Sequence, residues 1–172
     1  MSKEISRRGL FRLLSGGEHK APPLPDIPAI CPPWAREKCD YLALCERCTL
    51  CADACPKRVI RPLSSREEAL NGIAVLNMDY GECDFCGQCV EVCPTGALNF
   101  EHGTKAQAAV KLTGTCDRIL GMPCTMCAES CLEQAITLGD RSSPPEIDSD
   151  ACTGCGACAL GCYSRALTML KR

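Results

Sequence analysis

Short stretches in which apolar and polar residues alternate recur along the chain, and such alternation predicts half-buried β-strands. Three of these stretches, residues 98–100, 136–138 and 167–170, each follow an alanine and begin with an aliphatic residue. Two more, residues 74–79 and 145–148, are predicted to be the partner strands of small hairpins. The hydrophobic pattern therefore predicts repeated units, each made of a strand, a loop, a short helix and a second strand.

Three other segments carry local signals. Residues 64–72 begin with a capping box and end in Gly72, which predicts a short helix. Residues 140–145 contain Asp, Ser and Pro and are predicted to form a turn. Residues 16–33 contain six prolines, so we expect an extended linker there.

The predicted units carry repeated groups of cysteines. Three groups have the spacing C-x2-C-x2-C-x3-C, and proline follows the last cysteine in the first two of them. The third group along the chain is irregular, because seven residues separate its first two cysteines. In chain order the groups, called motifs 1 to 4 below, are Cys45, Cys48, Cys51 and Cys55; Cys83, Cys86, Cys89 and Cys93; Cys116, Cys124, Cys127 and Cys131; and Cys152, Cys155, Cys158 and Cys162.

Cysteine is frequent, with 18 residues in a chain of 172, whereas aromatic residues make up only 4%. Because so few bulky side chains cannot fill a large core, we expect bound metal to contribute to stability. A disulfide scaffold is the other common explanation for many cysteines, and it belongs to secreted proteins. The formal net charge of −2 gives no sign of the basic surface that a nucleic-acid-binding protein needs.

The N-terminal residues resemble an export signal only in part. Residues 6–9 read Ser-Arg-Arg-Gly, as in a twin-arginine signal. Export also requires an apolar run of about 7–15 residues and a cleavage site, and neither follows. No stretch of the sequence predicts a transmembrane segment. We therefore expect a cytoplasmic protein, whose cysteines bind metal instead of forming disulfides.

The cysteine spacing is typical of 4Fe–4S clusters. Three cysteines two residues apart let one loop hold three corners of the cube, while the fourth ligates a neighbouring cluster and is followed by proline. Each motif therefore predicts a partner motif, and 16 motif cysteines predict four clusters, or three if motif 3 is degenerate. The pairing could be sequential (1 with 2, 3 with 4) or nested (1 with 4, 2 with 3).

Zinc is the alternative metal, but zinc sites favour pairs of C-x2-C separated by a longer gap. Cys31 and Cys39 fall outside every motif, and we interpret them as free, inert thiols. Trp34, after two prolines, is expected to cover the edge of a cluster or to pack the first unit.

With these residues in place, the chain resembles the ferredoxin-type accessory proteins of periplasmic nitrate reductase systems, the NapF type. The resemblance rests on Ser6-Arg7-Arg8-Gly9, Pro32-Pro33-Trp34, Cys45-x-Arg47-Cys48 and the irregular motif 3. It implies a cytoplasmic protein that associates with the catalytic subunit of the reductase and assists its assembly or redox poising. The missing proline after Cys162 and the extra Cys31 and Cys39 depart from the family pattern.

The sequence thus predicts an α+β, ferredoxin-like fold with two pseudo-symmetric cluster-binding units of short hairpins and helices. The expected regions are a basic segment and linker (residues 1–33), a first unit (34–100) and a second unit (101–172). The expected function is electron transfer by 4Fe–4S clusters, without a catalytic site, because no acid, base or nucleophile constellation stands out. The alternatives are an electron-carrying polyferredoxin subunit of a larger oxidoreductase and a zinc-binding interaction module.

Overall fold

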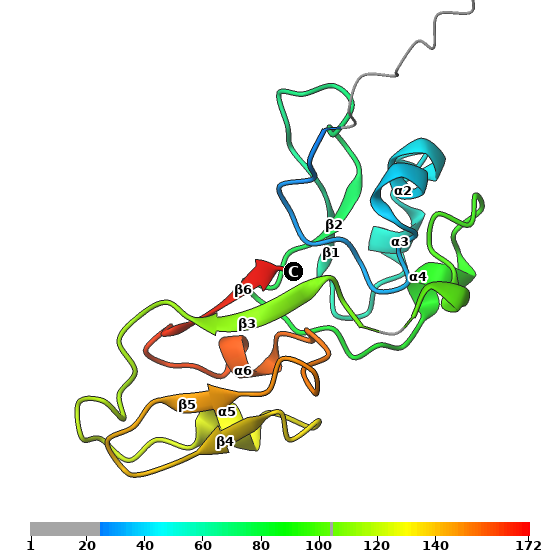
Figure 1. Cartoon of the computed structure of the whole chain (residues 1–172). Helices are drawn as coiled ribbons and strands as arrows, with labels where there is room; N and C mark the ends of the chain where they lie inside the picture. Colours follow the sequence, from blue (N-terminus) through cyan, green and yellow to red (C-terminus); the bar gives the residue numbers. More distant parts are fainter. Residues whose placement is uncertain (1–24, 104) are drawn as a thin grey trace, which may run out of the picture.

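The computed structural model describes residues 25–103 and 105–172, with Lys38 and Cys39 described by their backbone alone. Its elements are short, and loops connect them (Figure 1). In chain order they are α2 (Lys38–Leu44), α3 (Leu50–Asp53), β1 (Ile60–Pro62), β2 (Ala74–Leu76), α4 (Gln88–Glu91), the 3-10 helix η1 (Phe100–His102), β3 (Ala108–Leu112), α5 (Met126–Glu129), β4 (Ile136–Leu138), β5 (Pro145–Ile147), α6 (Ala157–Leu160) and β6 (Leu167–Lys171).

The strands form three antiparallel pairs, β1–β2, β4–β5 and β3–β6. β1 pairs with β2 in the half of the molecule that carries α2, α3 and α4, while the other two pairs lie together in the second half (Figure 1). In the second half, β4 and β5 are consecutive in the chain, and the last strand returns to pair with β3. Small hairpins with short helices make this an α+β fold, as the sequence predicts.

Two apolar cores hold these elements. The larger core runs from Ile27 to Ala108 and is centred on fully buried residues such as Tyr41 and Ile73. The Tyr41 hydroxyl donates a hydrogen bond to the Ala74 carbonyl at 2.5 Å, which ties α2 to β2. The smaller core contains Val110, Ile136 and Leu167, together with three motif cysteines. Cysteine side chains therefore form part of the interior in both halves.

Most of the predicted strands are confirmed. Residues 74–76, 136–138, 145–147 and 167–171 are strands, and residues 141–143 form the predicted turn. The stretch 98–100 is different, because Leu98 makes only an isolated bridge to Ala35 and the chain then enters η1. Asn99 caps η1 by accepting the N–H of Glu101 at 3.0 Å, so a local polar contact ends the strand.

The predicted helix at residues 64–72 is wrong. These residues form turns, in which Ser65 accepts the N–H of Glu67 at 3.1 Å. The guanidinium of Arg47 binds the carbonyls of Ala69 and Asn71, each at 2.9 Å. A capping signal followed by only a few residues gives little helix stability, and the contact with Arg47 favours the turns.

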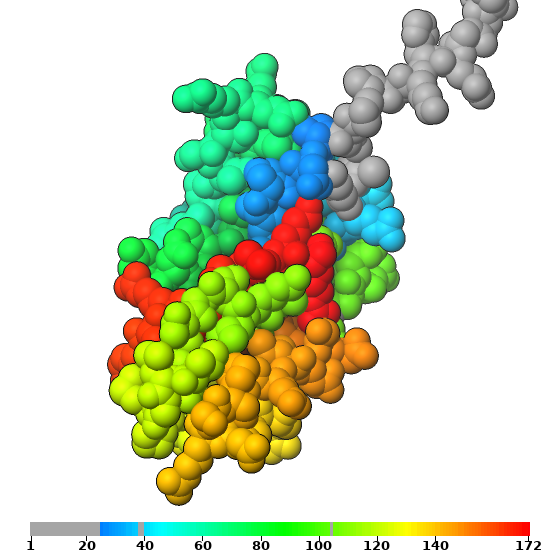
Figure 2. Space-filling model, turned by 60° about the vertical axis from the view of Figure 1, so that its left-hand side comes forward, coloured from blue at the N-terminus to red at the C-terminus, as the bar shows by residue number. Residues whose placement is uncertain are grey.

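Residues 25–33 have no helix or strand, as a linker would, but they pack against the folded part of the chain. Ile27 and Cys31 are buried, and Ile30 bridges Leu76. Figure 2 shows this segment in blue against the red C-terminal strand, where Lys171 binds Asp26 at 2.8 Å. The Ser-Arg-Arg-Gly motif at residues 6–9 lies outside the described residues.

The two halves touch directly at their cysteine loops. The N–H of Cys83 donates to the carbonyl of Cys155 at 2.8 Å. Beside it, Gly156 has a φ of 90°, which favours glycine, and a Cβ there would stand 2.6 Å from the sulfur of Met78. In the described part of the chain, no helix is both long enough and apolar enough to cross a membrane.

Candidate metal centres

The regular motifs share a tightly curled loop. The residues on either side of the second cysteine of each regular motif have a positive φ, which winds the backbone around one point instead of extending it. A four-residue helix (α3, α4 or α6) then carries the third cysteine. The flanking residues are Arg47 and Thr49 (φ 59° and 65°), Phe85 and Gly87 (55° and 79°), and Gly154 and Gly156 (78° and 90°).

Motif 3 reaches a similar arrangement by another route. Thr125 has a negative φ of −126°, so the loop is not curled there. Between Cys116 and Cys124, residues 117–121 form turns, one of them closed by the N–H of Ile119 on the carbonyl of Cys116 at 3.0 Å. Burial raises the pKa of Cys127, and the nearby thiols of Cys124 and Cys116 raise it further. The irregular spacing therefore still brings these three cysteines together.

The fourth cysteine has the same surroundings in motifs 2, 3 and 4. In each of these motifs, an alanine and the aliphatic residue after it, called the Ala–aliphatic pair, follow the fourth cysteine. A backbone N–H of this pair donates to the cysteine sulfur: Leu98 to Cys93 at 3.5 Å, Ala135 to Cys131 at 3.3 Å and Ala166 to Cys162 at 3.3 Å. The residue three positions after the fourth cysteine has a positive φ in all four motifs, namely Arg58, Gly96, Gln134 and Arg165. This contact explains why the Ala–aliphatic pair recurs in the sequence.

These hydrogen bonds favour the ionised thiol that iron binds. Burial opposes ionisation of Cys93, but donors from Leu98, Thr95 and Ala97 outweigh it and lower the pKa of that thiol. Elsewhere burial dominates. Burial, together with neighbouring thiols, raises the pKa of Cys51 to about 11 and those of Cys89 and Cys158 to about 12. Such crowded, buried thiols ionise readily only when a positively charged group lies among them.

Three hollows gather cysteines from two motifs each. In every case, three cysteines of one motif meet the fourth cysteine of its sequential partner. The resulting sets are set 1 (Cys45, Cys48, Cys51 and Cys93), set 2 (Cys83, Cys86, Cys89 and Cys55) and set 3 (Cys152, Cys155, Cys158 and Cys131).

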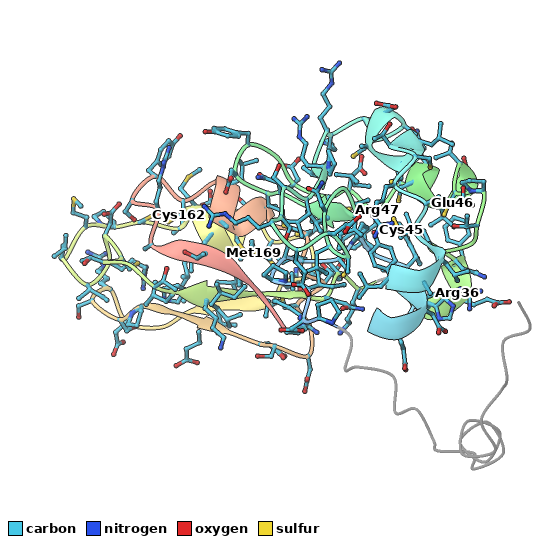
Figure 3. The ribbon with its side chains drawn as sticks, turned by 90° about the horizontal axis from the view of Figure 1, so that it is seen from above. Arg36, Cys45, Glu46, Arg47, Cys162 and Met169 are labelled. Carbon is cyan, nitrogen blue, oxygen red and sulfur yellow. The ribbon has the colours of Figure 1, made fainter. Side chains whose placement is uncertain are left out.

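The remaining motif cysteines are Cys116, Cys124, Cys127 and Cys162, called set 4. The end of motif 4 lies against motif 3, since a Cβ on Gly161 would stand 2.9 Å from the hydroxyl of Ser130. The helices α3 and α4 pack together in one half, as do α5 and α6 in the other. Figure 3 shows Cys45 and Arg47 in the first half and Cys162 with Met169 in the second.

The spacing of the cysteines within these hollows bears on which group they could hold. In residues 25–103 and 105–172, no three Cys, His, Asp or Glu side chains stand close enough to hold one bare metal ion. Thiolates on separate corners of a cube stand farther apart than thiolates on one zinc ion.

Trp34 provides a second test of fit. It lines the hollow of set 2 and also belongs to the larger apolar core, and only 4% of it is exposed. Its ring makes edge contacts with Phe85 and Phe100, at centroid distances of 6.2 and 5.4 Å. Its buried indole Nε1–H has no partner among the described residues. An N–H donor in this position suits a site that contains sulfur acceptors.

Several residues that shape these sites could not be identified from the cysteine spacing. Arg118 is buried beside Cys124. Arg47, Thr49 and Phe85 adopt a positive φ, which their residue types do not predict. Cys31 is buried near Cys45, and burial raises its pKa to about 11, consistent with an inert thiol. The side chain of Cys39 lies outside the described residues.

Comparison with known proteins agrees with this geometry. The 4Fe-4S dicluster domain profile matches residues 44–97, which hold motifs 1 and 2, and a 4Fe-4S binding domain profile matches residues 144–167. The Escherichia coli K12 ferredoxin-type protein NapF is 29% identical, over 98% of this chain and 96% of its own length. The methylamine utilization ferredoxin-type protein MauM of Methylorubrum extorquens is 35% identical, over 84% of this chain and 73% of its own length.

A ferredoxin-type protein NapG from Haemophilus influenzae is 29% identical, over 76% of this chain and 54% of its own length. These relatives are named as ferredoxin-type proteins, and the domain matches identify 4Fe–4S clusters as the cofactor. The resemblance drawn from the motifs is confirmed. The chain is an iron–sulfur electron-transfer protein and belongs to the NapF-type family of 4Fe–4S ferredoxin-type proteins.

Proposed function

We propose that this protein holds four 4Fe–4S clusters in sets 1 to 4 and works as an electron-transfer accessory protein. Its partner is the catalytic subunit of a periplasmic nitrate reductase, whose maturation or redox poising it assists in the cytoplasm. One observation carries the cluster assignment: the fourth cysteine of a motif lies with the first three of its sequential partner. This exchange is the ligand pattern of two-cluster ferredoxins.

The clusters supply one-electron chemistry, and the chain supplies their environment. Thiolates of each set would hold the iron, and the N–H groups of Leu98, Ala135 and Ala166 would stabilise the charge on the fourth thiolate. Trp34 and its aromatic neighbours would keep water from set 2. The direct contact between Cys83 and Cys155 would bring sets 2 and 3 close, so that electrons could pass between the halves.

We also propose that the two halves are pseudo-symmetric units, residues 34–100 and 101–172, preceded by the segment 1–33. The sequential pairing of α3 with α4 and of α5 with α6 supports this division. The separate apolar cores support it too, although the larger one extends to Ala108. Set 4 is included because Cys127 lies near Cys124 and Cys116, and because the end of motif 4, which carries Cys162, lies against motif 3.

The names of the relatives support a role beside a larger oxidoreductase. NapF and NapG point to the nitrate reductase system implied by the motifs, which makes that partner the first choice. The name of MauM refers to methylamine utilization, and this chain is more similar in sequence to MauM (35% identical) than to NapF (29% identical). This favours a second candidate function, that of an electron-carrying subunit of another oxidoreductase. In both cases, exposed apolar side chains next to fourth cysteines would suit a partner: Leu132 is 94% exposed and Tyr163 is 86% exposed.

The N-terminal segment offers a test of the partner. Residues 1–20 contain five Lys or Arg and two Asp or Glu, with Leu10, Phe11 and Leu14 among them. We expect deletion of residues 1–15 to leave the iron content unchanged and to weaken binding to the reductase subunit about tenfold or more, because a basic and apolar contact is lost. Co-purification and a binding titration with the full-length protein as reference would measure this.

A charge-preserving variant, Arg7→Lys with Arg8→Lys, is the matched control and should bind more tightly than Arg7→Ala with Arg8→Ala. Equal binding by the truncated and full-length proteins would contradict the role of this segment. Recovery of the full-length protein from the periplasm would contradict the cytoplasmic assignment.

A further inference from the structure

Arg118 is the one charged side chain that is buried in the described part of the chain, with 6% of its surface exposed. It lies in the seven residues that separate Cys116 from Cys124, the feature that makes motif 3 irregular. A guanidinium stays charged at any ordinary pH, so its burial places a permanent positive charge beside set 4.

The hydrogen bonds of Arg118 all end on backbone carbonyls. Nε donates to Ser143 at 2.9 Å, and Nη1 donates to Cys124 at 3.3 Å. Nη2 donates to Gly139 at 2.9 Å and to Asp140 at 2.6 Å. The ion pairs found among the described residues are Lys57–Glu82 and Lys171–Asp26, so no carboxylate pairs with Arg118.

A buried cation without an anionic partner is costly, because carbonyl dipoles replace only part of its hydration. Set 4 can supply the missing negative charge. Four thiolates around an oxidised 4Fe–4S core carry a net charge of about −2, and each electron taken up makes the site more negative. The carbonyl of Cys124, which accepts from Arg118, belongs to a residue of that set.

We propose that Arg118 is a positioning residue that sets the reduction potential of the set 4 site, making electron uptake easier there than it would be without the charge. This inference rests on the proposed binding of a cluster by set 4. It also gives the irregular spacing of motif 3 a purpose, since the inserted residues bring the guanidinium to the site.

Arg47 provides a matched comparison. It lines the hollow of set 1 and donates to two backbone carbonyls, but its side chain is exposed. Solvent and salt screen an exposed charge far more than a buried one. Replacing Arg47 should therefore change the potential of its site much less than replacing Arg118.

The test is a potentiometric titration of the loaded, full-length protein with dithionite and ferricyanide, followed by electron paramagnetic resonance. Comparison with the Cys124→Ala, Cys127→Ala double variant identifies the signal that belongs to set 4. In Arg118→Met, we expect the ratio of reduced to oxidised set 4 at a fixed potential to fall about tenfold, equivalent to about 59 mV for a one-electron couple. Arg118→Lys should stay near the wild-type value, and Arg47→Met should leave set 1 nearly unchanged.

The iron content is a second readout, which covers the case in which Arg118→Met fails to load iron at set 4. Loss of about four irons in Arg118→Met, with full loading in Arg118→Lys, would support the role of the charge. Loss in both variants would overturn it, because the hydrogen-bonded fork would then be what matters. An unchanged potential in a loaded Arg118→Met protein would also overturn it. If the cysteine double variant loses no iron, set 4 holds no cluster and the proposed function itself is wrong on that point.

Discussion

Removal of iron from the purified protein is expected to abolish its cooperative fold. The helices α3 to α6 have four residues each and the strands three to five, and such elements are not stable without tertiary packing. The packing that exists depends on cysteines: Cys55 and Cys89 belong to the larger core, and Cys127, Cys152 and Cys158 belong to the smaller one. Because binding free energy at a structural metal site becomes folding free energy, the metal-free chain should unfold.

Circular dichroism and thermal melting of the protein, before and after anaerobic treatment with a chelator and an oxidant, would measure this. The near-ultraviolet signal of buried Trp34 and Tyr41 should disappear together with the melting transition, and reconstitution with iron and sulfide should restore both. A mock-treated sample is the control. A metal-free protein with native-like spectra and a cooperative melt would refute the dependence on clusters.

The second large effect concerns the exchange of fourth cysteines. Changing Cys45, Cys48 and Cys51 to Ala together should remove the iron of set 1, leaving about 12 of 16 irons per chain. Adding Cys93→Ala to this triple variant should cost no further iron, because Cys93 lies with set 1. Adding Cys55→Ala should cost about one to four more, because Cys55 lies with set 2.

The Cys93 and Cys55 additions are each other's control, since each changes the fourth cysteine of one motif. The reverse result, with further loss on adding Cys93→Ala and none on adding Cys55→Ala, would mean that each motif fills its own site. If the triple variant does not fold, the same comparison can be made in the second half. There Cys152, Cys155 and Cys158 form the triple, and Cys131 and Cys162 are the additions.

The sequence predicted those features that depend on local spacing. The positions of the motifs and of the strands at 136–138 and 145–147 follow from residue patterns, and the structure has them. It could not decide between sequential and nested pairing, because that choice depends on which helices pack together. The contacts between α3 and α4 and between α5 and α6 show that the motifs pair sequentially.

Other features arise from contacts between residues far apart in the chain. The helix predicted at 64–72 is absent, because Arg47, more than 20 residues earlier, takes carbonyls of that segment. Trp34 lies at set 2, although motif 1 is the first motif after it in the chain. This position depends on its packing against Phe85 and Phe100. Arg118 gave no signal either, since one arginine in a loop is an ordinary surface residue until its burial is known.

The central claim is that four sets of cysteines hold four clusters. Its most direct test is the iron and acid-labile sulfide content of the anaerobically reconstituted protein, measured per chain and supported by Mössbauer spectra. The account predicts about 16 irons and 16 sulfides, all in 4Fe–4S centres, whereas about 12 would mean that set 4 is empty. About four irons or fewer per chain after full reconstitution would contradict the claim.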